Sequence, residues 1–112
     1  MSGFVIREWT LEPYDGDQAP PHIHHSGEEA FICIEGDLEV VVGEAVERVE
    51  PGHFALVARG QRHTFRSRRG SRVIAVMSPE IATLIDGLHQ DMTDEERKTL
   101  WERCNSTLVP ST

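Results

Sequence analysis

The stretch PPHIHHSGEEAFICIEGDLEVVVG, residues 20–43, decides the fold. Its short runs of Ile, Phe and Val alternate with Gly, Ser and Asp, which is the pattern of β-strands joined by tight turns. The same pattern continues on both sides, and closely spaced short strands are typical of an all-β sandwich or barrel. The expected strands are Val5–Thr10, His22–His24, Ala30–Ile34, Leu38–Val42, Ala45–Val49, His53–Val57, His63–Arg66 and Arg72–Met77.

The turns between these strands contain residues that favour chain reversal. Gly43 and Glu44 form a two-residue link between two β-branched runs, and Gly can occupy the first position of a type II′ turn. We therefore predict a tight hairpin there. Gly at 36, 52, 60 and 70 marks the other reversals.

The spacing of apolar residues changes from two to about 3.6 after Ser78, which predicts helices. Pro79 stands at a first-turn position of one helix, and Thr93 with Glu96 predicts a capping box at the start of another. The expected apolar faces comprise Ile81, Leu84, Ile85 and Leu88 in the first helix and Leu100, Trp101, Cys104 and Leu108 in the second.

The 112 residues are enough for one domain. We expect a single domain over residues 1–112, with a barrel over about 1–77 and a helical segment over about 78–108. Apolar residues make up 38% of the chain and charged residues 27%, as in soluble globular proteins. The net charge of −8 would repel a phosphate backbone, so nucleic acid is not expected as a partner.

Targeting signals and disulfides are not expected either. No apolar run approaches the roughly 18 residues that span a bilayer, and the start MSGFVIREWT lacks the layout of a signal peptide. Cys33 and Cys104 are too few to form a disulfide framework, so we expect free thiols. These features predict a cytoplasmic protein that does not bind membranes.

Four residues predict a metal site. His22 and His24 are two apart on a strand, so both imidazoles point to the same side. Glu29 opens the next strand, and a barrel would bring His63 across the interior to join them. Nitrogen and oxygen ligands of this kind suit one divalent transition metal (Fe, Mn, Co, Ni, Cu or Zn), and a six-coordinate ion would keep about two positions open.

The spacing of Gly16, His22, His24, Glu29 and Gly36 reproduces the first cupin motif without a mismatch. The chain resembles cupins over about residues 16–78, and especially the small single-domain cupins described as quercetin-dioxygenase-like. The resemblance implies a cupin (jelly-roll) β-barrel, here followed by two C-terminal helices. It also implies the metal site already inferred from the residues.

The second cupin motif is present with two departures. Gly52, Gly60 and His63 have its spacing, but the family more often has Pro where Ala58 stands and Asn where Ser67 stands. Neither departure removes a predicted ligand.

Nearby residues offer alternatives to this ligand set. Glu28 competes with Glu29, but the six-residue spacing to Gly36 favours Glu29 and leaves Glu28 facing solvent. His25 would be a hydrogen-bond partner or a further imidazole, although its strand parity opposes that of His24 and favours the surface.

Other residues are assigned to packing. Phe31 and Cys33 share the parity of Glu29 and are expected to face the interior. Trp9 and Trp101 are expected to serve either core packing or a subunit contact, between which the sequence does not choose. His53 and His89 are given no functional role. Further candidate wall residues are Phe54, Leu56, Phe65, Ile74 and Val76.

Three functions are compatible with such a site. The resemblance favours an enzyme, a dioxygenase-type oxidoreductase acting on a small organic substrate, with Glu29 also serving as a proton acceptor. The second is a metal-dependent isomerase, cyclase or lyase without O₂ chemistry, and the third is a non-catalytic small-molecule-binding protein. Oxygen consumption would separate the first two, and tight binding without turnover would indicate the third.

The residues leave the substrate, the physiological metal and the pathway open. We also expect a homodimer, because the strand Val5–Thr10 would leave an unpaired edge and small cupins commonly pair such strands between subunits.

Overall fold

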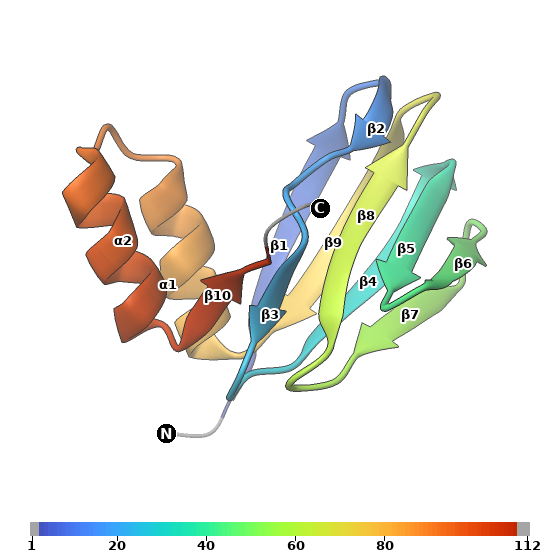
Figure 1. The fold of residues 1–112 in the computed structure, drawn as a ribbon. Helices are drawn as coiled ribbons and strands as arrows, with labels where there is room; N and C mark the ends of the chain where they lie inside the picture. The colour runs from blue at the N-terminus through green and yellow to red at the C-terminus, as the bar shows by residue number, and fades with distance from the viewer. Residues whose placement is uncertain (1–2, 110–112) are drawn as a thin grey trace.

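The computed structural model describes residues 3–109 and contains two antiparallel β-sheets that face each other, with two helices at one side (Figure 1). The helices are α1 (Pro79–Leu88) and α2 (Asp94–Arg103). The strands are β1 (Val5–Leu11), β2 (Tyr14–Asp17), β3 (His22–His24), β4 (Glu29–Gly36), β5 (Leu38–Val42), β6 (Ala45–Val49), β7 (Phe54–Val57), β8 (Arg62–Ser67), β9 (Ser71–Met77) and β10 (Ser106–Leu108).

The strand order confirms the predicted all-β jelly-roll with C-terminal helices. One sheet has the order β1-β9-β4-β7, and the other has the order β10-β3-β8-β5-β6, with β2 also paired to β8. Strands distant in sequence are therefore neighbours, as in double-sheet jelly rolls. The predicted hairpin is also confirmed, since Val42 pairs with Ala45 and Gly43 has a φ of +59°.

The hydrophobic core lies between the two sheets. Burial alternates along β4 and β9, so that one set of side chains points inward and the other points away from the core. Phe31 and Cys33 are buried, as their parity with Glu29 predicted. The core cluster comprises Phe31, Cys33, Leu38, Val40, Val49, Ala55, Val57, Val73, Ala75, Met77, Ile81 and Ala82.

The predicted orientation of four wall residues is wrong. Phe54 and Leu56 are 66% and 57% exposed, and Ile74 and Val76 lie with them on the outer face. Directly opposed residues share a face, and Glu29 lies opposite both Val57 and Met77 in the register. That pairing turns the alternate residues of β7 and β9 outward. Phe65, the fifth predicted wall residue, does pack against the core.

The C-terminal segment differs from the prediction at Leu108. Helix α2 ends at Arg103, and Asn105, with a φ of +51°, reverses the chain. Residues 106–108 then form β10 beside β3, so Leu108 belongs to a strand rather than to the helical stripe. Asn tolerates this left-handed conformation at a helix end, which allows the abrupt change.

The helices close one side of the barrel. Leu84 of α1 packs with Leu100 and Cys104, and the predicted capping box of Thr93 and Glu96 is present at the start of α2. Asp86 of α1 accepts two hydrogen bonds from Arg7 of β1, at 2.8 and 3.4 Å, which ties the helix to the first strand. Cys33 and Cys104 are both buried free thiols.

Among residues 3–109 there is no helix with the length and apolar character needed to cross a membrane.

Candidate metal centre

Three elements bring the four predicted ligands together. Strand β3 directs His22 and His24 to the same side, and the antiparallel pairing with β8 puts His63 directly opposite His22. Glu29 begins β4 in the facing sheet, where its parity turns it into the barrel. The side chains of His22, His24, Glu29 and His63 are all buried.

The three imidazoles form a compact cluster. The candidate ligand atoms of His22, His24 and His63 all lie within 4.8 Å of one another, and their ring centroids are 4.3–5.0 Å apart. An Oε1 of Glu29 lies 3.6 Å from Nε2 of His24 and 3.5 Å from Nε2 of His63. The carboxylate thus stands beside two of the three rings.

Hydrogen bonds at Nδ1 fix how the rings are presented. The carbonyls of Pro20 and Gln61 can only accept, so His22 and His63 donate from Nδ1, at 2.8 and 3.1 Å. His24 Nδ1 lies 2.7 Å from the hydroxyl of Ser106. In each neutral ring this arrangement leaves Nε2 with a free lone pair, which is the tautomer that binds a metal ion.

Ser106 is placed to accept from His24. Its own hydroxyl donates to the carbonyl of Cys104 at 3.2 Å, so its proton is already used. The residue lies on β10, next to His24 in the register, which explains why the chain returns to β3 after α2.

Unpaired nitrogen atoms in the cluster show that these residues fit a metal ion. Nε2 of His24 and Nε2 of His63 are buried and have no hydrogen-bond partner. Buried polar atoms are nearly always paired, because desolvating one without compensation costs about 1–3 kcal/mol. A divalent cation bound between these nitrogens and the Glu29 carboxylate would satisfy both.

The charge states suit the same ligand. Burial, followed by the repulsion of His63, lowers the pKa of His22 to about 4, so the ring is neutral at neutral pH. Burial alone would raise the pKa of Glu29, but contacts with His24 and His63 outweigh it and hold that pKa below its ordinary value. Neutral imidazoles and an ionised carboxylate are the forms that coordinate metals.

The rival residues lie outside the cluster. His25 is exposed and bonds to the hydroxyl of Thr107 at 2.8 Å. Glu28 points to solvent and lies 3.7 Å from Arg59, so the carboxylate inside the barrel is that of Glu29. The two motif departures are accommodated locally, since Gln61 accepts from the Ala58 N–H and Ser67 donates to the Asp37 carbonyl.

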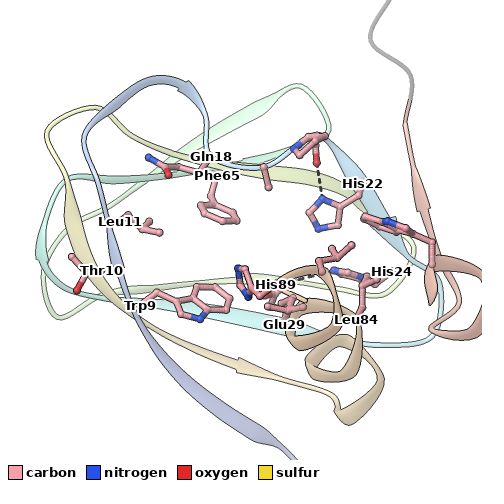
Figure 2. A pocket seen from close by; sticks show the side chains of 15 residues that line it. Trp9, Thr10, Leu11, Gln18, His22, His24, Glu29, Phe65, Leu84 and His89 are labelled. Carbon is pink, nitrogen blue, oxygen red and sulfur yellow. Dashed lines mark hydrogen bonds and ion pairs between the residues drawn. The ribbon is translucent and has the colours of Figure 1, made fainter. Parts of the chain in front are cut away.

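A cavity of about 360 Å³ opens next to the cluster, with His22, His24 and Glu29 in its lining (Figure 2). Trp9 and Trp101 also line it, and Trp101 packs edge-on against His22 with ring centroids 5.9 Å apart. Both tryptophans are thus cavity walls, a role that the sequence interpretation did not include.

His89, which is given no functional role from the sequence, also lines the cavity. Its position four residues after Ile85 puts it on the same helical face as that apolar residue, and this spacing was the available signal. The sequence contains no comparable signal for Ser106, because the predicted helical segment extends over the residues of β10.

A jelly-roll barrel with a buried cluster of three histidines and a carboxylate beside an open cavity defines a β-barrel protein whose site fits metal binding. The chain belongs to the Cupin_2 family, described as Cupin domain, which it matches over residues 8–78. No curated protein matches the chain.

Solved structures share this fold. A cupin-2 domain containing protein from Shewanella frigidimarina NCIMB 400 has a TM-score of 0.59 at 17% identity, over 68% of this chain and 71% of that one. The protein TT1209 from Thermus thermophilus has a TM-score of 0.59 at 25% identity, over 68% and 72% of the two chains.

A third similar structure is a sugar phosphate isomerase from a cupin superfamily of Silicibacter pomeroyi, with a TM-score of 0.58 at 24% identity over 70% of this chain. The match covers 52% of that longer chain, so the present chain corresponds to about half of its length.

Proposed function

We propose that the protein is a metal-dependent enzyme that acts on a small organic molecule, with one divalent transition metal held by His22, His24, Glu29 and His63. The observation that carries the proposal is the pair of buried, unpaired Nε2 atoms of His24 and His63 beside the Glu29 carboxylate. The cavity adjoining this cluster gives a small molecule room to approach.

The first reaction class that we propose is a dioxygenase-type oxidation. The bound metal would supply Lewis acidity and a site for O₂. The Glu29 carboxylate is ionised and faces the cavity, so it can also accept a proton from a bound substrate. The Nδ1 hydrogen bonds hold the rings in place.

The second candidate is a metal-dependent isomerase, cyclase or lyase without O₂ chemistry. It is supported by the similarity to the sugar phosphate isomerase from Silicibacter pomeroyi. In this case the same carboxylate would move a proton between substrate atoms.

Metal content tests the proposal. Untagged protein grown in a balanced metal mixture is expected to carry close to one transition-metal ion per chain by mass spectrometry. His24→Ala and Glu29→Ala should lose most of it. His25→Ala and Glu28→Ala are matched controls, since they alter the adjacent, outward-facing residues and should keep the metal. Wild-type protein that neither carries nor takes up any of these ions would refute the proposal.

Oxygen uptake separates the two reaction classes. Fe- or Mn-loaded protein that consumes O₂ in the presence of a substrate supports the dioxygenase chemistry. Substrate conversion that proceeds equally under strict anaerobiosis supports the second class instead.

A further inference from the structure

The cavity beside the histidine cluster has one predominantly apolar wall from the barrel and another from α1. Trp9 and Phe65, with nearly parallel rings whose centroids are 6.4 Å apart, line the barrel side. Figure 2 shows both rings in the cavity, with Leu84 and His89 of the helical segment near the histidines. The apolar residues in the lining are Trp9, Leu11, Ala19, Pro20, Phe65, Leu84, Ile85, Leu88 and Trp101.

The helical wall comes from the C-terminal part of the chain. Ile85 and Leu88 lie beyond residues 8–78, which match the family, so the family resemblance does not define this side of the cavity. The half-buried Ile85 side chain also packs against the main core. This wall is therefore fixed to the barrel and can select a ligand by shape.

Cations are missing from the lining. Among the described residues that surround the cavity there is neither Lys nor Arg. Phosphate groups are usually recognised by Arg or Lys side chains. A phosphorylated sugar would thus have no side-chain cation to offset its charge.

The volume favours a ligand with one or two rings. A cavity of about 150 Å³ lined by aliphatic and aromatic side chains is enough for benzene, and the present cavity is about 360 Å³. Aromatic walls contact such a ring by offset or edge-on packing at centroid distances of about 4.5–7 Å.

We propose that the cavity selects an unphosphorylated substrate with an aromatic ring, which packs against Trp9, Phe65 and α1 while its oxygen substituent faces the histidine cluster. The inference rests on the proposed function, because it names the substrate class of that site. His89 would lie beside the ring at the end of α1, where it can hydrogen-bond to a further substituent.

Calorimetric titration with phenol and with glucose 6-phosphate tests the selectivity. Both probes are titrated into metal-free and zinc-loaded protein. The metal-free titration measures the contribution of the cavity walls to binding without that of the ion. Phenol is expected to bind in both states, and glucose 6-phosphate is expected not to bind to the metal-free protein.

Ile85→Thr replaces an ethyl group of the helical wall with a smaller, polar hydroxyl and should weaken phenol binding about tenfold, since the ring loses apolar contact and the hydroxyl pairs poorly there. Ile74→Thr makes the same change on the outer sheet face and should leave binding unchanged. Leu88→Thr repeats the test from the same helix if Ile85→Thr is poorly folded by circular dichroism.

Three results would overturn the inference: folded protein that does not bind phenol, glucose 6-phosphate that binds the metal-free protein as tightly as phenol, or wall variants that bind phenol normally. Metal content of the same preparations keeps the two proposals apart. If the protein carries metal but does not bind phenol, only the proposal of an aromatic substrate is refuted. If it binds phenol but takes up no metal, only the proposal of a metal-dependent enzyme is refuted.

Discussion

Ser106 holds one of the proposed ligands from outside the cluster. Its hydroxyl accepts from His24 Nδ1 at 2.7 Å and is itself oriented by the Cys104 carbonyl. Such partners fix the orientation of a coordinating ring, and their loss typically weakens metal binding by about 10–100-fold. The candidate metal centre therefore includes a hydrogen-bond partner on β10.

Ser106→Ala is expected to weaken metal affinity by about 10–100-fold while leaving the fold intact. Competition against a fluorescent zinc chelator measures this change. Thr107→Ala is the matched control, because Thr107 is the next residue on β10 and bonds to the exposed His25. Equal affinities of the two variants would show that the Ser106 hydroxyl does not orient His24.

Gly36 is required by both backbone conformation and space. Its φ is +94°, and an added Cβ would collide with the backbone of Gly70 and Ser71. Gly43 also has a positive φ, of +59°, but a Cβ there would meet nothing within 4 Å. A comparison of substitutions at the two positions therefore separates the cost of backbone strain from the cost of steric collision.

Gly43→Ala is expected to cost about 1–2 kcal/mol from strain alone. Gly36→Ala should cost about 1–3 kcal/mol more, because the collision adds overpacking. Urea unfolding followed by tryptophan fluorescence gives both free energies. If the two variants are equally destabilised, the collision is relieved by backbone movement.

The clustering of the four candidate ligands could be predicted from the sequence because each signal is local. Two-residue spacing on a strand fixes the common direction of His22 and His24, and motif spacing picks Glu29 over Glu28. The partner of His24 lies 82 residues away, and no local pattern connects the two. His89 carried a helical-spacing signal, but only the packed position of α1 reveals that this face lines a cavity.

At the scale of single elements, α2 depends on its capping box. The Thr93 hydroxyl accepts from the Glu96 N–H, and the Glu96 carboxylate accepts from the Thr93 N–H. The backbone and side-chain hydrogen bonds of Thr93 lower the pKa of Glu96 from its ordinary value of 4.5. The contribution of this carboxylate to stability is therefore complete above about pH 4.5 and is lost as the pH falls through its lowered folded-state pKa.

Thr93→Ala is expected to lower the free energy of unfolding by about 1 kcal/mol at neutral pH. Glu96→Gln removes the charge, and its deficit relative to wild type should shrink as the pH falls below about 4. Thermal unfolding at a series of pH values checks both effects. A Glu96→Gln deficit that grows in acid would contradict this assignment.

Strand existence was easier to predict than strand facing. The turn residues on either side of β5 and β6 predicted the first and last residues of both strands correctly. In β7 and β9, however, apolar residues occupy both faces, so alternation carries no information about which face is inside. The register with Glu29 decides it, and register is a property of the assembled sheet.

At the scale of the whole molecule, the outer face of the four-stranded sheet is unusually apolar. A solvated face of an antiparallel sheet normally carries polar residues. Here two rows of neighbouring residues cross all four strands. Glu8 is the charged residue in these rows, and its carboxylate lies 3.4 Å from the Arg72 guanidinium. The rows are Ile6, Val76, Ala30 and Leu56, and Glu8, Ile74, Ile32 and Phe54.

We propose that a second copy of the chain covers this face, which also includes the predicted edge strand β1. The molecule has a net charge of −8, and this nearly uncharged face lets two acidic copies meet without placing like charges together. Light scattering after size exclusion is expected to give about twice the chain mass of 12.6 kDa.

Leu56→Glu should convert the dimer to a monomer, because it puts a charge at an exposed apolar position within the proposed contact. Val46→Glu is the control, since Val46 is similarly exposed at 53% but lies on β6 of the other sheet. A wild-type protein of 12.6 kDa at micromolar concentration would contradict the proposal.

The pairing of β10 with β3 also sets an order of events during protein synthesis. A ribosome adds roughly 5–20 residues per second, and His24 and Ser106 are 82 residues apart. His24 therefore exists for about 4–16 s before its hydroxyl partner is made. The nascent chain has its four proposed ligands well before it can orient them all, so the orientation of His24 depends on completion of the C-terminal strand.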